Sequence, residues 1–183
     1  MWHPIKHFKT ITKHRHRVIY HCFKVGIPWQ GLKHDLSKYS LTEFLPGAKY
    51  FVGVRSPNEL EREDKGYSTA WLHHKGRNRH HFEYWQDAVP GQQKPLCPVE
   101  MPVKYVAEMF CDRVAASKIY KGKSYHNGCA YEYFAAKKDI LPMHPNTKAL
   151  LESWLVTLRD KGEKVAFAEV KQYVKANKKK KKK

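Results

Sequence analysis

The spacing of apolar residues constrains the fold of this chain more than any other feature. In the first part of the chain they recur at intervals of three and four, which places them on one face of a helix predicted over residues 9–26. That face carries Ile11, His14, Val18, Cys22 and Val25. Gly26 is suited to end this helix, and Pro28 is suited to the first turn of a short second helix that reaches about residue 38.

The same periodicity continues to the end of the chain. It predicts helices over residues 102–121, near 129–138, from Asn146 through Leu158, and over 165–176. Strand-like alternation is nearly absent, and no internal repeat is visible. The chain has 183 residues, of which 42% are hydrophobic, so it can bury a core of its own. We therefore predict an all-α protein with a single domain.

The chain is strongly basic, with a formal net charge of +18. Six of these charges form the terminal run 178–183, which leaves +12 on the rest of the chain. We expect residues 1–177 to form the domain and residues 178–183 to be a disordered poly-lysine tail. The remaining excess of positive charge favours anionic partners. These are either small phosphorylated compounds, for example nucleotides, or nucleic acid bound through the basic surface and the tail.

Cysteine usage and hydropathy bear on the compartment. The four cysteines show neither a CxxC pair nor a zinc-finger spacing. The start "MWHPIKHFKT" lacks the apolar segment of a signal peptide, and no run reaches the roughly 18 apolar residues of a transmembrane helix. We therefore expect a cytoplasmic protein with reduced thiols and no membrane partner. The oligomeric state is left open.

The stretch "AWLHHKGRNRHHFEYW", residues 70–85, holds two adjacent pairs of histidines. The pairs are His73–His74 and His80–His81. Gly76 is expected to break the first helix, and Asn78 to cap a second one, so that both pairs turn toward one point. Taken alone, the stretch fits either a basic surface patch or one wall of a metal pocket.

A second stretch, "QGLKHDLSK" at residues 30–38, supplies the adjacent pair His34–Asp35. Farther along, Asp112 falls on the apolar stripe of the predicted helix 102–121, where an unpaired carboxylate would cost several kcal/mol. A bound cation offsets that cost, and imidazole nitrogen with carboxylate oxygen suits a transition metal. In "SLTEF", Ser40 and Glu43 have the spacing of a capping box, which would explain both residues without any chemistry.

In chain order, the set of His14, His34–Asp35, the histidine-rich junction and Asp112 resembles the HD-domain superfamily of metal-dependent phosphohydrolases. More narrowly, "QGLKHDLSKYSLTEF" together with "AWLHHKGRNRHHFEYW" is similar to an uncharacterised bacterial family placed near that superfamily. The resemblance implies a helical bundle of HD type. Its metal-site core would span about residues 10–120, and the helices of residues 123–177 would complete it.

The resemblance also implies the ligands. His14, His34, Asp35 and Asp112 match the four core metal ligands of the superfamily. Members with two metals use two further histidines between the HD pair and the last aspartate. His74 and His81 are expected in that role, with His73 and His80 as alternates. The implied cofactor is one or two divalent transition metals per chain (Mn, Fe, Zn, Co or Ni).

The implied reaction is hydrolysis of a small phosphorylated compound by a metal-activated water. Asp35 would serve as ligand and orient the water, and Lys38 falls where similar enzymes keep a phosphate-contacting lysine. Three arginines are expected to add anion contacts, with solvated surface charge as the alternative interpretation. They are Arg77, Arg79 and Arg113.

Two other functions remain open from the sequence. Some proteins with this helical arrangement hold two irons and activate oxygen, and the dense histidines permit that chemistry. A basic nucleic-acid-binding protein is the third hypothesis. The charge supports it, although no helix-turn-helix, zinc-finger or RNP signature is present.

Overall fold

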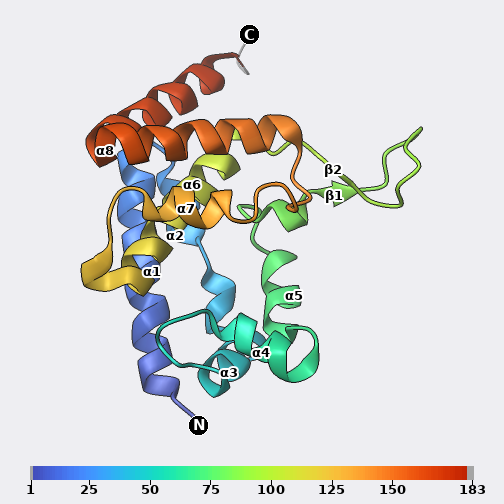
Figure 1. Ribbon diagram of the computed structural model, residues 1–183, viewed down its shortest axis with the longest axis vertical. Helices are drawn as coiled ribbons and strands as arrows, with labels where there is room; N and C mark the ends of the chain where they lie inside the picture. The colour runs from blue at the N-terminus through green and yellow to red at the C-terminus, as the bar shows by residue number, and fades with distance from the viewer. Residues whose placement is uncertain (1, 181–183) are drawn as a thin grey trace.

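Helices form almost all of the regular structure in residues 2–180, which are the residues that the computed structural model describes (Figure 1). The α-helices are α1 (Pro4–Lys24), α2 (Pro28–Lys33), α3 (Leu41–Lys49), α4 (Pro57–Lys65), α5 (Thr69–Lys75), α6 (Val103–Lys121), α7 (Cys129–Ala135) and α8 (Pro145–Lys180). Short 3-10 turns are η1 (Leu36–Tyr39), η2 (Phe82–Tyr84) and η3 (Gly122–Ser124). The prediction of an all-α, single-domain protein is confirmed.

One antiparallel pair of two-residue strands, β1 (Gln86–Asp87) and β2 (Cys97–Pro98), interrupts the helical architecture. The chain between these strands projects from the body of the molecule (Figure 1). This segment belongs to the Pro- and Gln-rich stretch of the sequence.

The apolar core lies between α1, α6, α7 and α8. The inward stripe of α1 is buried as the periodicity predicts, and it meets α6 and α8 through Val18, Phe110, Trp154 and Leu155, all almost fully buried. Burying one such side chain contributes about 1.5–3 kcal/mol to folding, so this contact alone fixes α1 firmly against α6. Firm packing here matters because both helices also carry polar residues of the candidate site.

Helix α8 contains a sharp bend at Gly162, where φ is 79° and ψ is 172°. Only glycine adopts this conformation readily, and the bend separates the two helices that the sequence predicted here. The second half continues to Lys180, and Lys178 Nζ donates to Gly26 O at 2.8 Å. Residues 178–180 therefore extend the helix, where the sequence predicted the start of a disordered tail; residues 181–183 of the predicted tail lie outside the described part.

A second group of helices, α3, α4 and α5, packs against the N-terminal half of α1 (Figure 1). Two glycines permit the close approach. A Cβ on Gly31 would lie 2.7 Å from Cys22 Cβ, and a Cβ on Gly47 would lie 2.3 Å from His7 Nε2. Helix α1 thus lies between α6 on one side and α2 with α3 on the other, and polar residues from both groups meet beside it.

Within residues 2–180, no helix combines the length and the apolar character needed to cross a membrane.

Candidate metal centre

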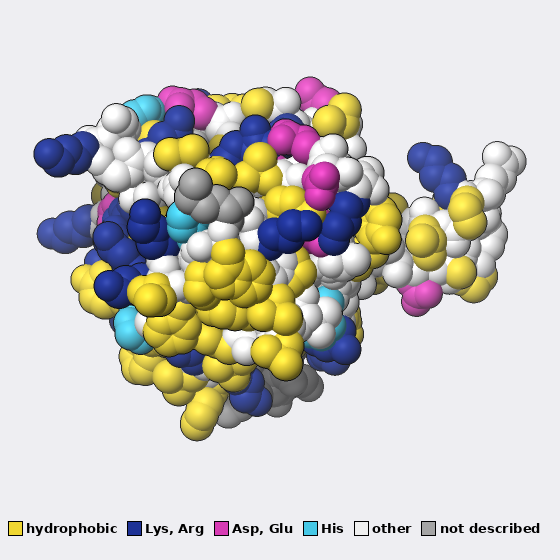
Figure 2. Space-filling view, turned by 90° about the horizontal axis from the view of Figure 1, so that it is seen from below, with side chains coloured by type: hydrophobic (Ala, Val, Ile, Leu, Met, Phe, Trp, Pro, Cys, Tyr) yellow, Lys and Arg dark blue, Asp and Glu magenta, His cyan; other side chains and the backbone are white. Residues whose placement is uncertain are grey.

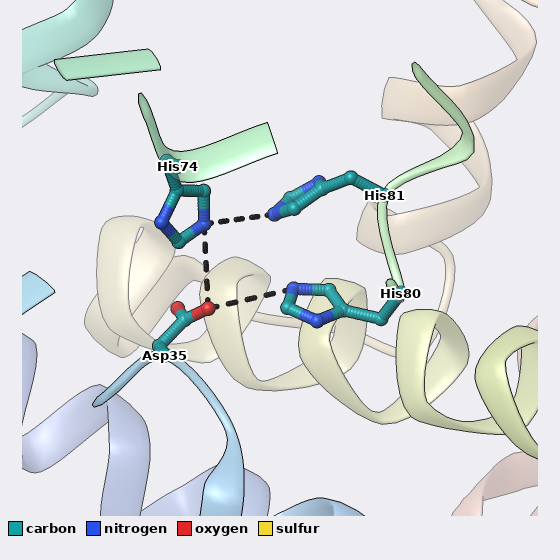
Figure 3. Close-up of side chains that lie close together, drawn as sticks. All are labelled: Asp35, His74, His80 and His81. Carbon is teal, nitrogen blue, oxygen red and sulfur yellow. Dashed lines mark hydrogen bonds and ion pairs between the residues drawn. The ribbon is translucent and has the colours of Figure 1, made fainter. Parts of the chain in front are cut away.

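A cluster of buried or nearly buried histidines and carboxylates lies where the two helix groups meet. Helix α1 contributes His14, the α2–η1 junction contributes His34 and Asp35, and α6 contributes Glu108 and Asp112. The end of α5 contributes His74, and the turn that follows it contributes His80 and His81 (Figure 3). The sequence-predicted ligands are therefore brought together from four separate parts of the chain.

Asp35 occupies the centre of this cluster and is 2% exposed. Its Oδ2 lies 3.2 Å from His34 Nε2, and its Oδ1 lies 3.3 Å from His74 Nε2 and 3.5 Å from His80 Nε2. Asp35 is also the one non-glycine residue with positive φ (53°) in the described chain. This left-handed conformation is tolerated best by Asp and Asn, and its cost is characteristic of functional sites.

Asp112 approaches the same point from α6. Its Oδ1 lies 3.0 Å from His14 Nε2 and 3.7 Å from His34 Nε2, while Oδ2 lies 4.0 Å from His80 Nε2. Both carboxylates thus lie within 4.0 Å of Nε2 of His14, His34 and His80. His14 Nε2 also lies 3.9 Å from Asp35 Oδ2, which closes the group.

Two further carboxylates hold the rings in place from behind. Glu108 Oε1 accepts from His34 Nδ1 at 3.0 Å and lies 3.2 Å from His80 Nδ1. Glu43 Oε2 accepts from His74 Nδ1 at 2.7 Å. Because an ionised carboxylate can only accept, each of these Nδ1 atoms carries a proton, and Nε2 is the ring nitrogen that faces Asp35. Carboxylates behind metal-ligating histidines commonly orient them in this way.

The sequence interpretation of Glu43 is therefore wrong. Ser40 does precede α3, but its side chain makes no capping bond. Glu43 is 4% exposed and points to His73 and His74 instead of back to the helix end. The charge-assisted bonds to the two imidazoles outweigh the local capping interaction.

Four buried atoms of the cluster have no hydrogen-bond partner: His14 Nε2, His34 Nε2, Asp35 Oδ1 and His80 Nε2. Buried polar atoms are almost always partnered, so four unpartnered atoms within one cluster are a feature that a bound cation would account for. Two atoms that bind one transition metal at ~2.1 Å lie at most ~4.2 Å apart. The separations of 3.0–3.9 Å among His14, His34 and the two aspartates satisfy this limit.

The pKa directions separate His34 from the other histidines of the cluster. Burial lowers the pKa of the imidazoles of His14, His74 and His81, so these rings are neutral and able to coordinate. Burial acts against ionisation of Asp35, but His34 and Lys38 hold the pKa of its carboxyl well below the usual range. Burial likewise lowers the pKa of His34, and the Asp35 charge reverses this and raises it well above the usual value.

The two histidine pairs do not each place one ring in the cluster and one outside it. His74, His80 and His81 all face Asp35 or one another, with His74 Nε2 and His81 Nε2 2.9 Å apart (Figure 3). His80, expected only as an alternate, is 1% exposed at the centre, and His73 turns to Glu43 Oε1. His81 is the more peripheral, since its ring also packs against Trp71.

The junction between the pairs also differs from the prediction. Asn78 does not cap a new helix; its Nδ2 donates to His74 O at 2.9 Å and to Ser37 Oγ at 2.8 Å. The chain then turns directly into η2. A tight turn instead of a second helix is what brings His80 beside Asp35.

Lys38 lies in the site, with Nζ 2.6 Å from Asp35 Oδ2. Arg77 and Arg79 are exposed and bond the backbone of His73 and the Tyr105 hydroxyl respectively. Arg113 lies over the Phe134 ring. Among the described residues, none of the three arginines bonds a member of the cluster, which agrees with the alternative of surface charge for Arg77 and Arg79.

Glu108 was not among the site residues predicted from the sequence, although helical spacing points to it. It precedes Asp112 by one helical turn on α6, so a shared face follows from helical spacing alone. The neighbours of Glu108 in the sequence, Ala107 and Met109, are apolar, so this turn of the helix resembles core sequence. Glu61 was also missed: this buried carboxylate accepts from Ser68 Oγ at 2.6 Å and Thr69 Oγ1 at 2.7 Å, and so fixes the start of α5.

The chain belongs to a family of unknown function (DUF5662), whose sequence profile matches residues 3–157. The match spans every residue of the cluster. No curated protein and no solved structure matches the chain significantly.

Proposed function

We propose that this protein is a metal-dependent phosphohydrolase of HD type that acts on a nucleotide or another small phosphorylated compound. The observation that carries the proposal is that two ligand sets meet at the buried Asp35, one with His14 and His34 and the other with His74, His80 and His81, and that four of their buried atoms have no hydrogen-bond partner. The chain order of His14, His34–Asp35 and Asp112 supports the HD type.

The residues divide into two overlapping ligand sets that share Asp35. His14, His34 and Asp112 with Asp35 Oδ2 would hold one divalent ion. Asp35 Oδ1 with His74, His80 and His81 would hold a second. When bound, such an ion supplies a Lewis acid and lowers the pKa of a bound water toward neutrality.

The other roles belong to the protein itself. Lys38 stands beside Asp35, where its ammonium can bind a phosphoryl oxygen and offset the charge that develops there. Glu108 and Glu43 keep the Nδ1 protons on His34, His80 and His74, and so hold the Nε2 lone pairs toward the ligand position. An oxygen-activating di-iron protein is the alternative, because a set of three histidines and one carboxylate suits iron as well as the other transition metals.

The experiment begins with the metal content of the purified full chain, measured by elemental analysis. The metal-loaded protein is then assayed against a panel of nucleotides and sugar phosphates, beside Asp35→Asn and Asp112→Asn. Asn tolerates positive φ, so Asp35→Asn removes the charge without adding backbone strain. We expect one or two metals per chain, and loss of both metal and phosphate release in the variants.

The outcomes separate the alternatives. Iron with oxygen consumption and no phosphate release would replace the hydrolase with the oxygenase. Full hydrolysis by metal-free protein, or failure to bind any of Mn, Fe, Zn, Co or Ni, would refute the metal proposal. Binding of RNA or DNA that falls steeply with salt, in protein that takes up no metal, would favour the nucleic-acid hypothesis.

A further inference from the structure

The solvent-facing side of α1 mixes cations with large apolar side chains. At 100° per residue, Lys6, Lys9, Lys13, Tyr20 and Lys24 lie within roughly 60° of one another on this helix. Beside them Ile5 is 70% exposed and Phe23 is 55% exposed. A helix with apolar and cationic residues on one exposed side is unusual for a face that meets only water.

The apolar surface continues onto the neighbouring elements. Trp29 on α2 is 70% exposed and Leu36 on η1 is 52% exposed. Helix α2 packs against α1 at Gly31, so Trp29 is carried by the element next to α1. Figure 2, which looks at the N-terminal end of α1, shows hydrophobic side chains gathered over that end with Lys and Arg around them.

This part of the molecule exposes no carboxylate. Residues 2–58 contain two acidic residues, Asp35 and Glu43, and these are only 2% and 4% exposed because they belong to the candidate metal centre. Every acidic side chain at the surface of the described residues therefore comes from Glu59 onward. The carboxylates near α1 belong to other elements: Glu63 and Asp64 of α4 line a pocket with His3, and Glu163 of α8 acts against the lowering of the His21 pKa by burial. The exposed charged side chains of α1 and α2 themselves are all cationic or histidine.

We propose that this α1–α2 face docks onto an anionic lipid bilayer surface. Aromatic and aliphatic side chains would enter the boundary between headgroups and acyl chains, while the lysines reach the lipid phosphates. A second copy of the chain would bring the same lysines against this face. Nucleic acid would leave the aliphatic side chains without a partner.

The proposal revises the expectation of no membrane partner, which took account only of spanning segments. It is independent of the hydrolase proposal. The C-terminal end of α8 is a second cationic region that would attract anionic lipid, because Lys178 bonds Gly26 O and belongs to the terminal lysine run. The test must therefore separate the α1–α2 face from the tail.

The experiment measures flotation of the full chain with vesicles of phosphatidylglycerol and phosphatidylcholine, and with phosphatidylcholine alone. Lys9→Gln with Lys13→Gln tests charge, since both lysines are exposed and neither forms a hydrogen bond or ion pair with another described side chain. Lys104→Gln with Lys137→Gln is the matched control on a distant surface. Trp29→Ala tests insertion, and truncation after Asn177 tests the tail.

We expect binding to the anionic vesicles only. The α1 pair should weaken it by about fivefold per lysine, while the control pair changes it little. Trp29→Ala should weaken binding and reduce the blue shift of tryptophan fluorescence. No binding to anionic vesicles would overturn the proposal. So would equal binding by the α1 and control pairs, or binding that disappears with the tail alone.

Discussion

At the scale of single residues, one carboxylate oxygen decides the geometry of two histidines. Glu108 Oε1 lies between His34 Nδ1 and His80 Nδ1, at 3.0 and 3.2 Å. It fixes which nitrogen of each ring is protonated, and therefore which nitrogen faces Asp35. Without that negative charge, neither ring is held in one tautomer.

Glu108→Gln tests this role. Gln has nearly the same shape but no charge, so we expect the fold to persist and the metal affinity to fall by about 10–100-fold. Isothermal titration calorimetry with the metal ion measures this affinity. The matched control is Glu100→Gln on the surface, which should bind like the natural protein. Unchanged affinity in Glu108→Gln would remove Glu108 from the site.

A second residue-scale prediction concerns His21, which lies outside the metal centre. Burial lowers the pKa of His21 to about 4, and its Nδ1 lies 3.2 Å from Cys111 O. The unfolded chain, with a pKa near 6.5, therefore binds more protons as the pH falls. The free energy of unfolding should drop by about 3 kcal/mol on this account between pH 7 and pH 4.

The measurement is denaturant unfolding of metal-free protein across that pH range. His21→Gln keeps a hydrogen-bond donor but does not titrate, so its stability should depend less on pH. His16→Gln, an exposed position on the same helix, serves as control. If the His21→Gln and natural proteins showed the same pH dependence, the burial argument would be wrong.

At the scale of elements, the short helix α2 positions the site through its contact with α1. It ends at Lys33, directly before His34 and Asp35, and Gly31 brings it against Cys22 and Ile19. The distance between α1 and α2 therefore controls how far His34 and Asp35 lie from His14.

Gly31→Ala should disturb that distance. The added Cβ would lie 2.7 Å from Cys22 Cβ and 3.1 Å from Ile19 Cα, so the helices must separate. We expect a loss of about 1–3 kcal/mol in stability and weaker metal binding. Gly76→Ala is the control, because its Cβ would meet nothing closer than 3.5 Å. Equal stability of the two variants in thermal unfolding would contradict this account of the packing.

At the scale of the whole molecule, the candidate metal centre lies where two helix groups meet. His14, Glu108 and Asp112 belong to the group around the core, and His74 belongs to the group of α3, α4 and α5. An ion bound by both groups would stabilise the folded state alone.

Removal of metal should therefore lower the thermal stability of the whole domain. At a metal concentration of 100 Kd the stabilisation is about 2.7 kcal/mol, which corresponds to a fall in Tm of roughly 5–10 °C on chelation. Differential scanning calorimetry with and without chelator measures it. In Asp35→Asn the two curves should coincide. A chelator effect that persisted in Asp35→Asn would place the metal elsewhere.

The sequence by itself determined the helical class and most of the residues in the cluster. Periodicity at three and four residues gives the helices, because a buried stripe requires it whatever the tertiary arrangement. His14, His34, Asp35, His74, His81 and Asp112 were named by residue type and chain order. All of them lie in the cluster.

The tertiary structure alone decided which carboxylates stand behind the histidines and which ring of each pair faces Asp35. Glu43 had a sufficient local explanation in capping, and His80 had the same local sequence character as His81. The positions of both side chains depend on contacts with elements distant in the chain, namely α5 for Glu43 and α6 for His80. Local spacing fixes which face of a helix a residue occupies, but the packing of separate helices decides which groups meet there.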